Sequence, residues 1–172
     1  HKNIIKETFD SVSNEYDSQA LRFFPESSNY LTSLLRLRGN EHVIDVATGT
    51  GNAALAIATR LPEGSVTGLD ISPGMLDQAR RKASLRHLNN VRFVEMDMQA
   101  LDFAAAQFDI AICAFGIFFV DDMDAQLSTI AKITKPGGTI AMCNFQEDYF
   151  NPLRDLMINR LTRYNVQLPP QT

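Results

Sequence analysis

The chain has 172 residues, 45% of them hydrophobic and 21% charged, a composition typical of one globular domain. Sixteen basic against twenty acidic residues give a formal net charge of -4 at pH 7, which argues against a nucleic-acid partner. The longest apolar stretch, residues 110–120, is eleven residues long. A membrane-spanning helix needs about twenty, so no membrane span is expected.

The first forty residues contain no strand pattern. Polar and apolar residues recur at helical spacing over residues 2–37, which predicts two helices. A proline lacks a backbone N–H and interrupts a helix interior, so we expect the break near Pro25. Residues 1–40 are interpreted as an amino-terminal helical lid or cap, and residues 41–172 as the main domain.

From Glu41 onward, short β-branched runs alternate with helical segments, which is typical of a parallel sheet covered by helices. The runs are nearly continuously apolar, as expected for strands buried on both faces. We predict an α/β, Rossmann-like, doubly wound and mainly parallel sheet with helices on both faces. The predicted strands are residues 42–46, 65–70, 91–95, 108–114 and 139–145, and the crossover helices are residues 52–61, 73–87 and 123–134.

The carboxyl-terminal part looks incomplete for such a sheet. Residues 149–165 are predicted to be helical, and no sixth strand follows them. Because a bare apolar edge strand invites aggregation, we expect further strands to belong to this domain and the chain to be part of a longer one.

The two cysteines, Cys113 and Cys143, lie thirty residues apart, each in a predicted strand. They have neither C-x-x-C nor metal-ligand spacing. The sequence therefore predicts two packed, reduced thiols, no metal site and a cytoplasmic protein.

The segment "VIDVATGTGNAA", residues 43–54, joins the first predicted strand to the first crossover helix. Gly49, Gly51 and Ala54 match the G-x-G-x-x-G/A pattern of a dinucleotide site, and Asp70 lies about twenty residues downstream. The pattern indicates an adenosine-bearing cofactor, either a nicotinamide dinucleotide or another.

Acidic residues follow three neighbouring strands. In an open parallel sheet, ligands bind beyond the carboxyl ends of the strands. Asp70 could accept from the hydroxyls of a ribose, Asp97 from an exocyclic amine, and Met96 or Met98 could lie against a purine. The structural alternatives are that Asp70 only caps the next helix and that Met98 only fills the core.

Five segments in order carry a family resemblance: "VIDVATGTG", "GLDISPGMLDQAR", "VEMDMQAL", "FDIAICAFGIFFVDD" and "ITKPGGTIAM", within about residues 41–145, with a looser match at "FDSVSNEYD". With these motifs the chain resembles class I S-adenosylmethionine-dependent methyltransferases. The resemblance is strongest to the branch that includes the ubiquinone and menaquinone biosynthesis C-methyltransferases.

The resemblance implies the cofactor contacts residue by residue. Ala47 departs from the commonest form of the motif, which has glycine there. We interpret the alanine as making the bottom of the cofactor site slightly bulkier. The implied contacts are Asp45, Ala47, Thr48, Gly49 and Gly51 around the methionine part, Asp70 and Ile71 at the ribose and one adenine face, Asp97 and Met98 at the adenine, and Ala114 with Phe115 at the sulfonium.

The position of Asp45 bears on the choice of cofactor. It precedes Gly49 by four residues, and a fixed carboxylate suits the ammonium and sulfonium of S-adenosylmethionine but repels a diphosphate. The sequence therefore predicts S-adenosylmethionine as cofactor and S-adenosylhomocysteine as product. An NAD-dependent oxidoreductase remains the remote alternative.

Methyl transfer from a sulfonium is an in-line displacement in which the protein supplies alignment and desolvation. A dedicated base is optional. If a proton must leave, the candidates are Tyr16, Asp17, Asp121 and Asn144. Tyr16 is also a candidate cofactor contact, because the amino-terminal helices could close over the ligand as a lid and its ring could approach the sulfonium. The alternative is that these helices only pack on the sheet.

The stretch "FGIFFV" predicts a small-molecule acceptor that is apolar or aromatic, bound by Phe115, Phe118 and Phe119 with Phe23 and Phe24. The alternative is that these rings only pack the next helix. The quinone branch has polar residues in place of Phe118 and Phe119. The resemblance therefore does not imply that the acceptor is a quinone precursor. A non-catalytic S-adenosylmethionine-binding scaffold or sensor is the alternative function.

Overall fold

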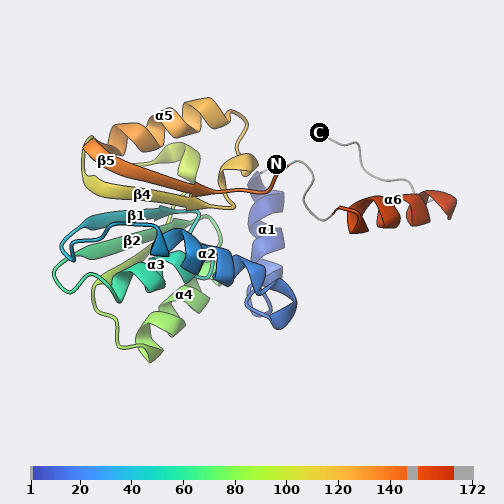
Figure 1. The fold of residues 1–172 in the computed structure, drawn as a ribbon, viewed down its shortest axis with the longest axis horizontal. Coiled ribbons are helices and arrows are strands. Elements are labelled where there is room, and N and C mark those ends of the chain that lie inside the picture. Colours follow the sequence, from blue (N-terminus) through green and yellow to red (C-terminus); the bar gives the residue numbers. More distant parts are fainter. Residues whose placement is uncertain (1, 147–150, 165–172) are drawn as a thin grey trace.

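The computed structural model describes residues 2–146 and 151–164. Five parallel strands form one sheet in the order β3-β2-β1-β4-β5, with helices on both faces (Figure 1). This confirms the predicted doubly wound α/β fold. The strands are β1 (His42–Val46), β2 (Ser65–Asp70), β3 (Val91–Glu95), β4 (Phe108–Ala114) and β5 (Thr134–Cys143).

Helices α4 and α5 each begin after a residue whose side chain caps them, Ser72 and Asp122. At α4, the Ser72 side chain accepts from the Met75 N–H and Pro73 stands at the first helical position. Among the described residues, no helix is both long and apolar enough to cross a membrane. The helices are α1 (Lys2–Val12), α2 (Phe23–Ser33), α3 (Asn52–Ala58), α4 (Pro73–Leu85), α5 (Met123–Ile133) and α6 (Leu153–Arg163), with the short 3-10 turns η1 (Gln19–Leu21), η2 (Met98–Ala100) and η3 (Ile117–Phe119).

The amino-terminal break differs from the prediction. The chain leaves α1 after Val12, and Pro25 lies inside the first turn of α2 rather than at the break. The first turn of a helix has no intrahelical partner for its N–H groups, so a proline there costs no hydrogen bond. The expectation of a break near Pro25 was wrong for this reason.

The fifth strand starts earlier than predicted. Thr134 already pairs with Phe108, and pairing resumes between Thr139 and Ile110 after an irregularity. Gly137, with φ 78, lies in the extra residues between these pairs. The segment at residues 135–138 is thus a bulge within β5. At the other end, α6 falls inside the predicted helix 149–165, of which residues 149, 150 and 165 lie outside the described part.

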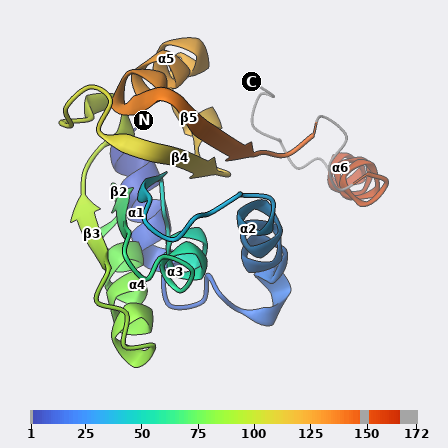
Figure 2. The same ribbon diagram turned by 60° about the vertical axis from the view of Figure 1, so that its left-hand side comes forward.

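The core has two halves, one on each face of the sheet. Residues of β1 such as Val43 face α2 and α3, whereas Ile44 faces α5. Figure 2 shows α5 on one side and α2, α3 and α4 on the other. Of the two free cysteines, Cys113 is fully buried, as predicted for a packed thiol, whereas Cys143 is only partly buried.

Helix α1 belongs to neither layer. It stands across the end of the sheet toward which β4 and β5 point, beside α4 (Figure 1). The amino-terminal region is therefore divided: α2 packs next to α3, whereas α1 reaches the carboxyl ends of the strands.

Candidate functional site

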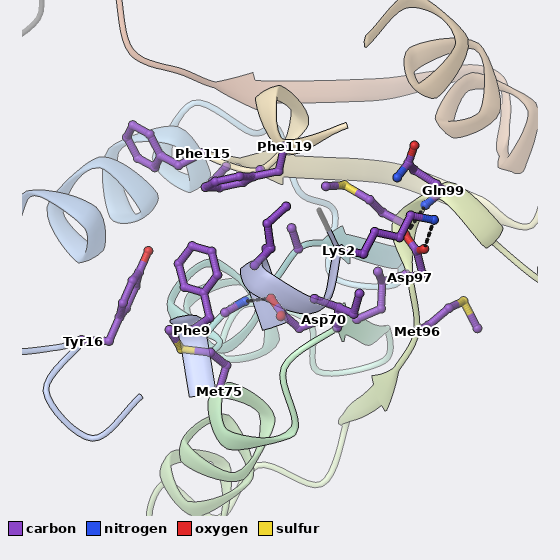
Figure 3. Close-up of a pocket in the computed structure, with 18 residues that line it drawn as sticks. Lys2, Phe9, Tyr16, Asp70, Met75, Met96, Asp97, Gln99, Phe115 and Phe119 are labelled. Atoms are coloured by element: carbon purple, nitrogen blue, oxygen red, sulfur yellow. Dashed lines mark hydrogen bonds and ion pairs between the residues drawn. The ribbon is translucent and has the colours of Figure 1, made fainter. Parts of the chain in front are cut away.

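A cleft lies at the carboxyl ends of the strands, between the sheet and α1 (Figure 3). A smaller cavity adjoins it, and both are lined by Tyr16, Ala47, Gly49, Ala114 and Phe115. The cleft lies where the strand order reverses between β1 and β4, the usual ligand position in such sheets.

Asp70 ends β2 and is buried in the wall of the cleft. Its Oδ2 accepts from the Gly49 N–H at 2.8 Å and its Oδ1 from the Ser72 N–H at 3.0 Å. Burial raises the pKa of Asp70, against these backbone hydrogen bonds. The carboxylate therefore holds the glycine turn and the start of α4 together, and it still borders the cleft.

Asp45 braces the same turn from β1. Its Oδ2 accepts from Thr48 Oγ1 at 2.6 Å and from the Ala54 N–H at 3.1 Å. Burial raises the pKa of Asp45 to about 7, opposed by these two hydrogen bonds and assisted by the charge of Asp70. Because Ala54 lies in the first turn of α3, a carboxylate already occupies the helix end where a dinucleotide fold would hold a pyrophosphate.

Two non-glycine residues of the cleft have left-handed backbones. Ala47 and Phe115, each with φ 57, follow the neighbouring strands β1 and β4. Such conformations cost free energy outside glycine and gather at functional sites. The family's usual glycine at position 47 is explained by this φ, and Ala47 fits because its neighbour Gly116 has no side chain.

Asp97 is occupied by partners in this structure. Its Oδ1 accepts from the Gln99 N–H, and Lys2 Nζ of α1 lies 2.5 Å from its Oδ2. Figure 3 shows Lys2 beside Asp97, joined to it by a dashed line. An adenine amine that binds Asp97 would therefore compete with Lys2.

Further contacts hold α1 over the cleft. Lys6 pairs with Glu95 at 2.6 Å, and Asp10 accepts from Ser72 Oγ at 2.5 Å and from the Gly74 N–H at 2.9 Å. Asp10 thereby caps α4 from another helix. The apolar side chains of α1 that face inward, Ile5 and Phe9, line the cleft.

Tyr16 lies where the two cavities meet. Its ring stacks on Phe24, with centroids 5.1 Å apart and planes 17° apart, and Phe9 is 6.2 Å away. Burial raises the pKa of Tyr16 to about 12, assisted by the charges of Asp70 and Asp17. A phenol of this pKa keeps its proton at neutral pH, so it is a hydrogen-bond donor and a poor base.

The predicted site residues differ in whether they line the cavities. Gly51 lines neither cavity: it caps α3 with φ 80 and packs against Phe93. Asp17, Asp121 and Asn144, candidates for proton removal, are exposed and line neither cavity. Phe23 and Phe118, predicted acceptor contacts, line neither cavity either. Those that line the cavities are Tyr16, Phe24, Asp45, Ala47, Thr48, Gly49, Asp70, Ile71, Met96, Asp97, Met98, Ala114, Phe115 and Phe119.

Sequence reasoning missed Lys2, Ile5 and Gln99 as cleft residues. The spacing of Lys2, Ile5 and Phe9 puts them on one face of a helix, and that periodicity could have identified the face of α1 that meets the cleft.

A family model described as a methyltransferase domain matches residues 43–138. Aklanonic acid methyltransferase DauC of Streptomyces sp. strain C5 is 31% identical over 142 residues, which is 82% of this chain and 64% of that protein. Demethylmenaquinone methyltransferase of Thermus thermophilus is 40% identical over 105 residues, 61% of this chain and 47% of that protein. The chain thus spans less than two thirds of the length of these relatives.

Solved structures show the same fold. An S-adenosylmethionine-dependent methyltransferase from Aquifex aeolicus superimposes with a TM-score of 0.68 at 18% identity, over 95% of this chain and 90% of that one. The [4+2]-cyclase SpnF superimposes with a TM-score of 0.73 at 21% identity, over 82% and 59%. The matched residues 43–138 include the glycine turn, Asp70 and Asp97. The chain therefore belongs to the methyltransferase-domain family, and it is similar to demethylmenaquinone and ubiquinone/menaquinone biosynthesis methyltransferases.

Proposed function

We propose that the protein transfers the methyl group of S-adenosylmethionine to a small apolar or aromatic acceptor by in-line displacement. The observation that carries the proposal is the convergence of Asp45, Asp70 and Asp97, from three successive strands, on two adjoining cavities. Three carboxylates along one cleft suit a ligand with an ammonium, a ribose and an exocyclic amine.

The cleft fits the cofactor in shape as well as charge. A Cβ built on Gly49 meets nothing within 4 Å, so the space above the glycine turn is open to a ligand. Ile71, Met96 and Met98 line the half of the cleft near Asp97 and offer apolar surface to a purine. In this proposal the adenosine lies in the larger cavity and the methionine part in the smaller one, beside Asp45 and Thr48.

When bound, S-adenosylmethionine supplies a methyl group on a positively charged sulfur. The protein's part is to align the acceptor and exclude water, which α1 favours by covering the cleft. Tyr16 keeps its phenolic proton, and its ring offers a π face to the sulfonium. We therefore propose that the acceptor brings its own nucleophilic atom and that Tyr16 acts as a cofactor contact rather than a base.

A cluster of phenylalanines beside the cleft supports an apolar or aromatic acceptor. The Phe115 ring lies 4.8 Å from that of Phe145, 5.0 Å from Phe24 and 6.3 Å from Phe23. Phe118 lies 5.9 Å from Phe145 by centroid. Aromatic rings of a ligand could stack among these rings, since offset and edge-to-face arrangements are favourable at such distances.

The second candidate function is a cofactor-binding scaffold or another reaction on the same site. The neighbour named as a [4+2]-cyclase shares this fold at 21% identity, and a shared fold does not imply a shared reaction.

Calorimetric titration with S-adenosylhomocysteine and with NADH tests the cofactor, and transfer of a tritiated methyl group tests the reaction. We expect S-adenosylhomocysteine to bind, NADH not to bind, and label to pass to aromatic or apolar small molecules but not to RNA. NADH binding alone would refute the proposal. Cofactor binding without transfer to any acceptor would favour the scaffold.

The ion pair between Lys2 and Asp97 gives a further prediction. Lys2→Met should strengthen S-adenosylhomocysteine binding about threefold to fivefold, because Asp97 is then free for the adenine amine and exposed ion pairs are worth up to about 1 kcal/mol. The control is Lys6→Met, which breaks the pair with Glu95, a residue outside the cleft. Weaker binding by the Lys2 variant, measured by calorimetry, would mean that Lys2 itself holds the ligand.

A further inference from the structure

Four polar side chains form a closed network at the outer wall of the smaller cavity. Asp17 Oδ1 accepts from Thr50 Oγ1 and from Asn52 Nδ2, each at 2.9 Å, and Asp17 Oδ2 pairs with Lys82 Nζ at 2.7 Å. Lys82 Nζ also donates to Thr50 Oγ1 at 3.1 Å and to Asn52 Oδ1 at 2.9 Å. All three protons of the ammonium thus have an acceptor.

The network joins three separate parts of the chain. Asp17 belongs to the segment between α1 and η1, Thr50 and Asn52 to the glycine turn and the start of α3, and Lys82 to α4. The side-chain exposures of Lys82 and Asp17 are 21% and 34%, so their pair is more shielded from solvent than the Arg80–Asp77 pair on the same helix. Burial raises the pKa of Asp17, but the hydrogen bonds from Lys82 and Asn52 outweigh this and hold it below its usual value.

Asp17 directly follows Tyr16, which lines both cavities. The neighbouring tie to α4 is a single exposed hydrogen bond of 2.6 Å from Gln78 Nε2 to Asn14 Oδ1. Position 17 therefore makes the strongest connection between the Tyr16 segment and the turn that the ligand contacts.

We infer that Asp17 is a positioning residue, which fixes Tyr16 over the methionine end of the cofactor by tying its segment to the glycine turn and to α4. The inference rests on the proposed function. It makes Asp17 a residue that affects cofactor affinity without touching the cofactor. Asp17 itself lines neither cavity, so its effect passes through Tyr16.

Asp17→Asn keeps an oxygen for Thr50 and Asn52 but removes the charge that faces Lys82. We expect it to weaken S-adenosylhomocysteine binding about fivefold to tenfold, to raise KM more than it lowers kcat, and to speed hydrogen exchange in residues 13–22 alone. Lys82→Gln should act in the same direction. The matched control, Asp77→Asn, breaks the exposed Asp77–Arg80 pair on the same helix and should change none of these.

A cycle with Tyr16→Ala separates positioning from general stability. If Asp17 acts through Tyr16, the double variant binds no more weakly than Tyr16→Ala alone. Unchanged affinity in Asp17→Asn, or losses that add fully in the double variant, would overturn the inference while leaving the proposed function intact. A wild-type protein that binds no S-adenosylhomocysteine would overturn both.

Discussion

Replacing Asp45 with asparagine is expected to weaken S-adenosylhomocysteine binding at pH 8 by about 10- to 100-fold, with the fold retained. Hydrogen bonds to charged groups are worth about 1.5–3 kcal/mol, and the variant loses the negative charge that we propose to face the ligand's ammonium. The amide oxygen can still accept from Thr48 and from the Ala54 N–H, which the carboxylate does now. Calorimetry at fixed pH measures the loss.

The pKa of Asp45 also predicts how ligand affinity changes with pH. Burial raises the pKa of Asp45 from 3.8 to about 7 in the folded protein. In the proposed binding mode the ligand's ammonium pairs with the ionised form of Asp45. Wild-type affinity should therefore rise with pH up to about 7 and level off above it, whereas Asp45→Asn should show no such rise.

The free energy of unfolding should change with pH in the opposite direction to the ligand affinity. Between pH 4 and 7 the unfolded chain has released the Asp45 proton and the folded chain still holds it, so the free energy of unfolding falls as pH rises through this window. Asp45→Asn should remove that part of the fall. Burial also raises the pKa of Asp70, so Asp70 should still contribute its own share of this fall in the variant.

Asp109→Asn is the control, because Asp109 pairs with Lys135 and accepts from the His42 N–H, away from both cavities. It should leave ligand affinity and its pH profile unchanged. An Asp45 variant that binds as tightly as wild type at pH 8 would restrict Asp45 to its role as a brace of the glycine turn.

The strands could be predicted from the sequence because each is a short apolar run buried on both faces. The first four predicted ranges agree with β1 to β4 residue for residue. The start of β5 could not be predicted in this way. Thr134 pairs with Phe108, and a bulge at Gly137 separates this pair from the rest of β5. Pairing between strands far apart in sequence produces no local residue pattern from which the start of β5 could be predicted.

The acidic residues of the site were also predictable, because parallel strands bring their carboxyl ends to one edge. Their partners were not. Lys2 and Asp97 are separated by 95 residues, and the position of α1 depends on tertiary contacts such as Asp10 with Ser72. Asp45 also accepts from the Ala54 N–H because the chain turns tightly at Gly49 and Gly51. The amino-acid sequence alone does not give the geometry of this turn.

The substitution Gly116→Ala is expected to destabilise the protein by about 2 kcal/mol, within the usual cost of overpacking. A Cβ at position 116 would lie 2.6 Å from Cβ of Ala47 and 3.2 Å from Sγ of Cys113. Gly116 has an ordinary φ of −116, so the cost comes from the clash and not from backbone strain. Since Ala47 and Gly116 both line the cleft, S-adenosylhomocysteine binding should weaken as well.

Ala47→Gly should restore most of this loss. It removes the atom that clashes and relieves the left-handed φ of 57, while its extra freedom in the unfolded chain costs about 0.4–1 kcal/mol. Alone, it should therefore change the free energy of unfolding by less than about 1 kcal/mol. Chemical denaturation of the four proteins in this cycle measures the coupling, expected at about 1–2 kcal/mol.

Gly137→Ala separates strain from clash in the same measurement. Gly137 has φ 78, and a Cβ there meets nothing within 4 Å, so its substitution adds strain alone and Ala47→Gly should not rescue it. A double variant of Ala47 and Gly116 as unstable as the sum of its single substitutions would show that Gly116 is required by Cys113 instead. In that case the alanine at position 47 would be tolerated for a reason other than the missing side chain of Gly116.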